Sequence, residues 1–159
     1  MQAKEKMLDL KSRMEKNVRE NILPFWCNYM VDEEKGGFYG KVNEDLTPDK
    51  TYPKAIVLNC RMLWAFTMGW EYFHDEKCRE LAHRAYEYIR DHFWDKEYGG
   101  TFWMLTSDGI PSEVEKRTYG EAFIIYSMAE YYNAFRKPEA LEMAMKTFRL
   151  VQDLSLIHI

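Results

Sequence analysis

The chain has 159 residues with a formal net charge of −4, and 47% of them are hydrophobic. This composition predicts a single packed domain and excludes a disordered chain. Acidic and basic residues are interspersed without a basic cluster, which excludes the electrostatic surface of a nucleic-acid-binding protein. The stretch "MQAKEKMLDLKSRMEK" at the start lacks an apolar signal region, and no apolar run reaches membrane-spanning length. We therefore expect a cytoplasmic protein without nucleic-acid or membrane partners.

The first predicted element is an amphipathic helix. Apolar residues recur at steps of three and four from Met7 to Leu23, which predicts a helix from about Ala3 to the residue before Pro24, or beyond it. The phrase "FYGKV" directly follows the first of two Gly-Gly pairs. Its short, aromatic and β-prone sequence predicts a strand or hairpin.

Four further helices are predicted, and they alternate in character. The helices at 53–73 and 115–135 are apolar on most sides, whereas those at 76–93 and 138–153 each have one apolar face. In the last helix this face consists of Leu141, Met145, Phe148 and Val151. The phrase "SDG" after the second Gly-Gly pair predicts a turn between two short extended pieces. Hairpins of alternating buried and half-buried helices are typical of a helical toroid or solenoid.

The two Gly-Gly phrases, "EEKGGFYGKV" and "KEYGGTFWML", stand 63 residues apart and indicate an internal repeat. Each lies where an outer helix passes to an inner one, and glycine there permits the positive φ of a tight reversal. A third pair is expected at about residue 163, beyond the last residue, and a toroid of six such hairpins needs about 380 residues. We therefore expect residues 1–153 to be the N-terminal portion of one toroid domain, with two and a half hairpins. Residues 154–159, which include His158, are expected to be a tail foreign to the repeat.

Five separated motifs carry a resemblance to a known family. They are "ILPFW" at 22–26, "EKGGFYGKV" at 34–42, "VLNCRMLWAF" at 57–66, "RAYEYIRDHFWDKEYGG" at 84–100 and "TYGEAFIIYSMAEYY" at 118–132. Together they resemble the N-terminal part of the cellobiose 2-epimerases, within the N-acylglucosamine 2-epimerase superfamily. The resemblance implies an all-α (α/α)6 barrel, with short β-hairpins at the Gly-Gly corners. It also implies an isomerase that inverts C2 of the reducing-end sugar of a β-1,4-linked disaccharide without a metal or organic cofactor.

Arg61 is the most informative candidate residue. It lies in an apolar helix without an acidic residue within one turn, where a charged side chain must be paired or reach water. One interpretation is that its guanidinium snorkels to solvent or pairs with a distant carboxylate. The resemblance favours another, in which Arg61 contacts the substrate oxygen that becomes negative when the proton on C2 is removed.

Substrate-binding roles are predicted for three more residues. Tyr119 resembles a family tyrosine that hydrogen-bonds the sugar, and Phe123 lies one turn further on its face, although such spacing is also typical of core packing. Asn59 belongs to the same asparagine-x-arginine phrase as Arg61. Glu121 stands where many relatives have glutamine, and we expect it on the pocket side of its helix.

Neither the histidines nor the cysteines predict a local catalytic centre. His74, His83 and His92 lack metal-ligand spacing, and the cysteines lack CxxC spacing, so we expect packed histidines and reduced thiols. Epimerisation needs an acid/base group on each face of an enediolate, and the resemblance places the two histidines concerned on later helices, outside this chain. We therefore expect an inactive fragment.

Three alternatives remain open. An N-acylglucosamine 2-epimerase or an aldose–ketose (mannose) isomerase shares the fold, and a ketose product would identify the isomerase. A helical-repeat scaffold without activity would present a polar concave surface. A glycoside hydrolase of the same fold needs two carboxylates across the scissile bond, and no such pair stands out. We expect the substrate to be cellobiose, lactose or mannobiose, and the full-length protein to be a monomer or weak homo-oligomer.

Overall fold

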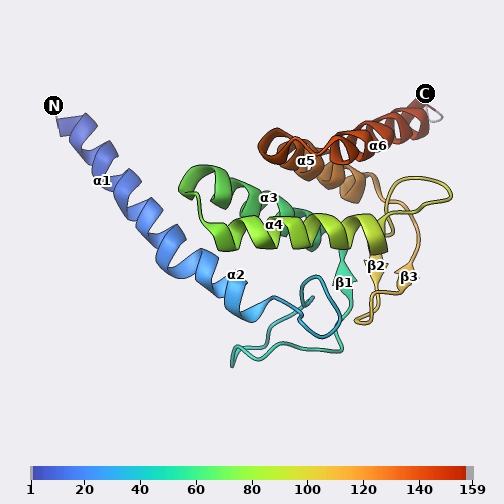
Figure 1. Ribbon diagram of the computed structural model, residues 1–159, viewed down its shortest axis with the longest axis horizontal. Coiled ribbons are helices and arrows are strands. Elements are labelled where there is room, and N and C mark those ends of the chain that lie inside the picture. Colours follow the sequence, from blue (N-terminus) through green and yellow to red (C-terminus); the bar gives the residue numbers. More distant parts are fainter. Residues whose placement is uncertain (1, 157–159) are drawn as a thin grey trace.

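The computed structural model describes residues 2–156, with side chains for residues 3–153, so that His158 and the end of the predicted tail lie outside the described residues. Figure 1 shows α1 projecting from a body built of two helical hairpins, with a small sheet at one end. The helices of the body are α3 (Ile56–Phe73), α4 (Glu76–Tyr88), α5 (Thr118–Phe135) and α6 (Pro138–Leu156). The strands are β1 (Lys54–Ala55), β2 (Met104–Leu105) and β3 (Pro111–Glu113).

The amino-terminal helix continues through Pro24. It consists of α1 (Gln2–Asn17), a π-helical turn η1 (Val18–Ile22) and α2 (Leu23–Tyr29), with Pro24 in the first turn of α2. Proline lacks an N–H and its ring clashes with the carbonyl four residues earlier in an α-helix. The wider π-helical turn η1 lies just before Pro24 and relieves this clash. The helix therefore continues through the proline instead of ending there.

The two hairpins are built alike, as the repeat predicts. The inner helix α3 packs on the outer helix α4 and on the next inner helix α5, and α5 packs in turn on the outer helix α6. Both inner helices end at a left-handed residue, His74 at φ 53° and Arg136 at φ 54°. A π-helical turn, η2 (Ile89–Phe93), extends α4 to the end predicted for that helix.

The apolar face predicted for the last helix is wrong. The fully buried residues of α6 are Ala140, Met143, Ala144 and Thr147, whereas Met145 and Phe148 are each 44% exposed. Small residues bring α6 close to α5, and the larger apolar residues lie on a face that the described chain leaves open.

The inner helices begin three residues later than predicted. Strand β1 occupies the two residues before α3, and the irregular segment 114–117 separates β3 from α5. Strand β1 pairs antiparallel with β2, with Lys54 opposite Leu105, and β2 pairs antiparallel with β3 through a bulge. The residue before α3 therefore belongs to an extended strand whose partner lies in the second repeat. The predicted turn between two extended pieces is confirmed by the β2–β3 hairpin.

No strand forms at "FYGKV" in the described chain, contrary to the prediction. Two isolated bridges, Val31–Phe38 and Val42–Pro48, replace it. The Tyr39 amide donates to the carbonyl of Met30 at 2.8 Å, which folds this segment back onto the end of α2. Gly40 lies so close to the carbonyl of Pro53 that a Cβ would stand 2.0 Å from it. The segment therefore packs between Met30, at the end of α2, and Pro53, before β1, and does not join the sheet.

Both Gly-Gly corners have the predicted left-handed backbone, and both contain an aspartate that accepts two backbone amides and pairs with a lysine. Gly36, Gly37, Gly99 and Gly100 have φ between 64° and 77°. At the first corner the Asp32 carboxylate accepts the amides of Glu34 and Lys35, and at the second Asp95 accepts those of Glu97 and Tyr98. A lysine that precedes the following inner helix then pairs with each aspartate: Lys54 Nζ lies 2.7 Å from Asp32 Oδ2, and Lys116 Nζ lies 2.6 Å from Asp95 Oδ2.

Within residues 2–156, no helix is long and apolar enough to span a membrane.

Candidate functional site

The site centres on the face of α3 and α5 that the outer helices do not cover. Arg61 is exposed, while its neighbours Cys60 and Met62 are buried beneath it. Its guanidinium Nη2 donates a long hydrogen bond of 3.5 Å to Tyr119 Oη, and its guanidinium carbon lies 5.1 Å from the centre of the Phe123 ring. The structure thus brings together three of the four predicted site residues, from helices one repeat apart.

Arg61 has no carboxylate within ion-pair distance among the residues with described side chains. Its visible partners are a phenol oxygen and the face of an aromatic ring, neither of which neutralises its charge. Because Tyr119 is 57% exposed, the fork of guanidinium donors and the phenol O–H open to the same side. Together they offer a fixed positive charge and hydrogen-bonding groups to an anionic or hydroxyl oxygen.

Asn59 is not part of this group. It is fully buried, and its Nδ2 donates to the carbonyl of Ala55 at 2.9 Å within the helix. Two residues along an α-helix differ by about 200° in direction, so Asn59 and Arg61 lie on opposite faces of α3. The structure therefore does not support direct contact between Asn59 and a ligand held by Arg61.

Glu121 also departs from expectation, because it does not face the open side. It is 1% exposed, and its Oε1 accepts the backbone amide of Thr101 at 2.8 Å. Glu121 is therefore turned toward the second Gly-Gly corner, which lies beside the first turn of α5.

A stacked aromatic pair continues the site by one helical turn: Tyr126, which the helical spacing from Tyr119 places on this face, and Trp64, which the sequence interpretation did not single out. Trp64 stacks on Tyr126 with ring centres 5.5 Å apart and an angle of 25° between the planes. Trp64 follows Arg61 by three residues and Tyr126 follows Phe123 by three, which places each pair on one face. We call Arg61, Trp64, Tyr119, Phe123 and Tyr126 the open aromatic face. Helical spacing from Arg61 was the signal that could have identified Trp64.

A cavity of about 220 Å³ borders this face between α2 and α3. Arg61 is its one charged lining residue, and Trp26, Leu58 and Phe66 supply much of its apolar wall. A hollow that joins one cation to apolar and aromatic walls has the composition common to small-molecule sites.

The histidines and cysteines of the described chain have packing roles. His83 Nδ1 lies 2.6 Å from Tyr131 Oη, and burial lowers the pKa of His83. His92 stacks on Tyr88 with ring centres 4.4 Å apart. Burial raises the pKa of the Cys60 thiol to about 12, so this cysteine is neutral and a poor nucleophile. Residues with described side chains contain no group of three or more metal-ligating residues.

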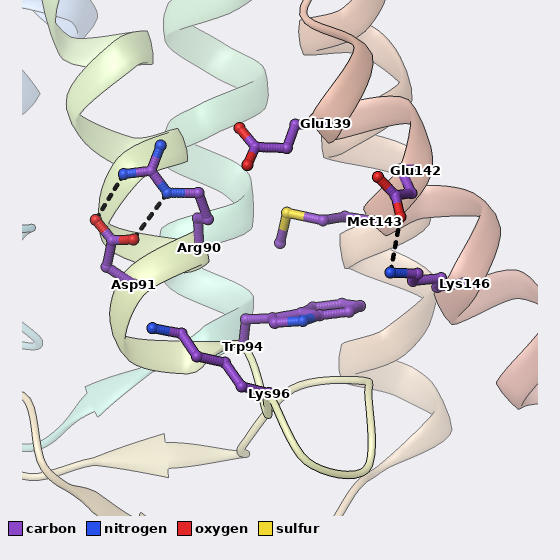
Figure 2. Close-up of a pocket in the computed structure, with 8 residues that line it drawn as sticks. All are labelled: Arg90, Asp91, Trp94, Lys96, Glu139, Glu142, Met143 and Lys146. Carbon is purple, nitrogen blue, oxygen red and sulfur yellow. Dashed lines mark hydrogen bonds and ion pairs between the residues drawn. The ribbon is translucent and has the colours of Figure 1, made fainter.

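A second cavity, of about 350 Å³, lies between the outer helices and is drawn in Figure 2. Trp94 and Met143 line it together with several charged residues. The charges are largely matched by near neighbours: Arg90 donates twice to Asp91 at 2.7 Å, and Lys146 lies 2.8 Å from Glu142. We interpret this cavity as a groove between neighbouring helices, because most of its charged residues, though not Lys96, have partners in the described chain.

Comparison with known proteins identifies the family. The sequence profile of the N-acylglucosamine 2-epimerase (GlcNAc 2-epimerase) family matches residues 21–155. The chain belongs to this family. Cellobiose 2-epimerase from Bacteroides fragilis is 38% identical over 146 residues, which cover 91% of this chain and 37% of that protein. The human N-acylglucosamine 2-epimerase of the same family is 25% identical over 145 residues, covering 84% and 33%.

Solved structures agree with this assignment. Cellobiose 2-epimerase from Spirochaeta thermophila superposes with a TM-score of 0.88 at 34% identity, over 93% of this chain and 36% of that one. These epimerase neighbours are (α/α)6 barrels, so the two hairpins form part of such a barrel, as the repeat and the resemblance predicted. A D-mannose isomerase structure, with a TM-score of 0.80 at 21% identity, shares the fold alone. The chain spans about a third of the length of its relatives.

Proposed function

We propose that this chain is the substrate-anchoring part of a carbohydrate 2-epimerase that acts on the reducing-end sugar of β-1,4-linked disaccharides such as cellobiose, lactose or mannobiose. The observation that carries the proposal is Arg61, which is exposed, has no acidic partner in the described chain and lies beside Tyr119 and Phe123. Identity to cellobiose 2-epimerases exceeds identity to N-acylglucosamine 2-epimerases, which favours a disaccharide substrate.

The proposed reaction inverts C2 by moving one proton. After the sugar ring opens, a base removes the C2 proton and the electron pair moves through the new C1–C2 double bond onto O1. A proton returned to the opposite face of C2 restores the aldehyde and gives the epimer. Arg61 stabilises the negative charge on O1, Tyr119 hydrogen-bonds the sugar, and Phe123 packs against it. The two acid/base histidines are supplied by parts of the protein outside this sequence.

An arginine-to-lysine exchange tests the role of Arg61. Residues 21–155 replace the matching segment of the Bacteroides fragilis enzyme, and the chimera is compared with its Arg61→Lys variant. Lysine keeps the charge but loses the planar fork of donors, so kcat and kcat/KM should fall together by about 10²–10³. Exchange of the C2 proton with solvent deuterium should slow to the same extent, since both pass through the enediolate.

Four outcomes would contradict the proposal. Near-native activity of the variant would make Arg61 a structural residue. A rise in KM alone would mean that it binds the ground-state sugar without stabilising the enediolate. A ketose product from the parent chimera would favour the aldose–ketose isomerase, and activity confined to N-acylglucosamine would favour the other alternative. Lys146→Arg, on an exposed helix face, serves as the matched control and should leave kcat unchanged.

A further inference from the structure

Glu121 is a buried acid that the proposed reaction does not use. It lies in the first turn of α5, two residues after Tyr119, and is 1% exposed. Its Oε1 accepts the amide of Thr101 at 2.8 Å, while its Oε2 is buried without a hydrogen-bond partner among the described residues. Carboxylates this deeply buried normally have both oxygens satisfied or a cation beside them.

The charged groups around Glu121 do not provide a dedicated counter-ion. From the segment before α5, Lys116 attracts the carboxylate, but its Nζ lies 2.6 Å from Asp95 Oδ2 and is committed to that pair. From α3, the group that faces it is the Cys60 thiol, whose pKa burial raises to about 12, so it is neutral. On the α6 side, Leu150 packs against Gly100 at the same corner. An ionised Glu121 would therefore be a buried charge without its own partner.

The first repeat has a neutral group at the equivalent place. Asn59 stands as far before the left-handed residue His74 as Glu121 stands before Arg136. Asn59 is likewise fully buried, and like Glu121 it has one oxygen without a partner in the described chain. An amide and a protonated carboxylic acid have the same planar shape, one acceptor oxygen and one donor side. The environment that accepts an amide in one repeat suits a neutral acid in the next.

We propose that Glu121 carries a proton in the folded protein and, in this neutral form, acts as a positioning residue that holds the second Gly-Gly corner against the first turn of α5. Tyr119 projects from that turn, so the anchored corner fixes the position of the phenol that meets Arg61. The effect on sugar binding depends on the proposed function, whereas the protonation and the anchoring do not.

A proton bound by Glu121 in the folded state makes the stability of the protein depend on pH. Burial raises the pKa of Glu121 above its ordinary value of 4.5. In the unfolded chain the group ionises near that ordinary value, so at higher pH the folded protein holds the extra proton. The stabilisation from Glu121 is then complete below the unfolded pKa and is lost as pH rises through the folded pKa. Where the two states differ by a whole proton, the unfolding equilibrium constant rises tenfold per pH unit.

The decisive experiment compares urea unfolding of the chimera described above, which contains residues 21–155, with that of its Glu121→Gln variant between pH 4 and 8. Glutamine resembles the neutral acid but cannot titrate, so wild-type stability relative to the variant should decline with rising pH above about 4.5. The proposal would be overturned if the difference in unfolding free energy between wild type and variant did not change with pH. It would also be overturned if the wild type became more stable relative to the variant as pH rises. Glu142→Gln is the matched control: hydrogen bonding to Lys146 lowers the pKa of Glu142 below 4.5, so wild-type stability relative to this variant should stay nearly constant above that pH.

Amide hydrogen exchange at Thr101 tests the anchoring directly and separately. At pH 5, Glu121→Gln should preserve protection of the Thr101 amide, whereas Glu121→Ala should lower it by at least tenfold. Thr101→Val keeps the backbone donor and removes a hydroxyl that lies 3.4 Å from Glu121, so it should leave protection nearly unchanged. If Glu121→Ala does not fold, the Glu121→Gln variant alone tests the proposal. Loss of protection of the Thr101 amide in that variant would contradict anchoring by a neutral side chain.

Discussion

At the scale of single residues, the most deeply buried charge of the first corner is Lys54. Its side chain is 1% exposed, and Nζ donates to Asp32 Oδ2 at 2.7 Å and to the carbonyl of Gly36 at 2.6 Å. The ammonium also lies 5.0 Å from the centre of the Tyr88 ring. Burial opposes ionisation of Asp32, but the hydrogen bonds from Lys54 and from backbone amides lower its pKa overall. The pair therefore fixes the corner while both members are charged.

Lys54→Met should be strongly destabilising. Removing the ammonium leaves Asp32 buried and unpaired, for which about 3–5 kcal/mol of unfolding free energy is the typical loss. Urea unfolding at pH 7 measures it. Lys116→Met, at the more exposed second corner, should lose less, and Lys146→Met on the surface should change little. Equal effects at the three positions would contradict the importance of burial. The stability that Asp32 contributes should also be lost as pH falls through its folded pKa, below 3.8.

At the residue scale, the signals that the sequence offers are local ones, and the catalytic role of Arg61 stays a prediction. Arg61 was identifiable because it is a lone charge in an apolar helix. Asn59 was placed with Arg61 on the strength of a shared phrase, although two helical positions point to opposite faces. The ion pair between Lys54 and Asp32 was missed because its members stand far apart in sequence. A signal existed: an aspartate stands at the same distance before each Gly-Gly pair.

At the scale of elements, the two Gly-Gly corners have the same backbone but different surroundings. A Cβ at Gly37 would lie 2.6 Å from the ring of Tyr88, whereas a Cβ at Gly99 would meet nothing within 4 Å. Both have positive φ, at 64° and 72°. Gly99 is therefore needed for its conformation alone, while Gly37 is needed for conformation and space.

Gly99→Ala should lower the unfolding free energy by about 1–2 kcal/mol, the usual penalty of a left-handed alanine. Gly37→Ala adds a steric clash with the buried ring of Tyr88. Its total loss of unfolding free energy should therefore be larger, about 3 kcal/mol or more. Urea unfolding of the two variants side by side measures this difference, with the unchanged chain as reference. Equal losses would show that Tyr88 moves aside freely.

The elements themselves were largely predictable. Helical periodicity and flanking prolines gave the ends of α3 to α5 within about three residues, because these signals are contained in each segment. The start of α3 was wrong because β1, which lies just before it, pairs with β2 of the other repeat. The late start of α5 follows from the irregular segment 114–117 after β3. The strand expected at "FYGKV" was wrong because this segment bonds to the residue after α2 and packs on Pro53 instead of on a neighbouring strand. The apolar face of α6 was misread because the small residues that pack on α5 are weaker hydrophobic signals than Met145 and Phe148.

At the scale of the whole molecule, the array of helices is open at both ends. On α1, the side chains of Met7, Leu10 and Met14 are each more than half exposed. On α6, Met145 and Phe148 form a second exposed apolar strip. Repeat proteins need a polar surface on their terminal repeats to remain soluble. At both ends of the described chain an exposed apolar strip takes the place of such a surface.

The chain alone should therefore self-associate and should not epimerise cellobiose. Light scattering on a size-exclusion column should give a mass above 19.1 kDa that grows with concentration. Replacing Met7, Leu10, Met145 and Phe148 by glutamine should reduce the association without loss of helix signal. A monodisperse wild-type monomer, or epimerisation of cellobiose by the isolated chain, would contradict this prediction and the placing of the acid/base histidines elsewhere.

The pairing of β1 with β2 also sets an order of events during synthesis. Lys54 and Ala55 leave the ribosome about fifty residues ahead of Met104 and Leu105, their antiparallel partners. At 5–20 residues per second, the nascent chain holds β1 as an unpaired edge for roughly 3–10 s. During that interval the first hairpin can pack through α3 and α4 but cannot close its sheet. Synonymous codons that slow translation between residues 56 and 104 would lengthen this exposure, and we expect them to lower the yield of folded protein in cells.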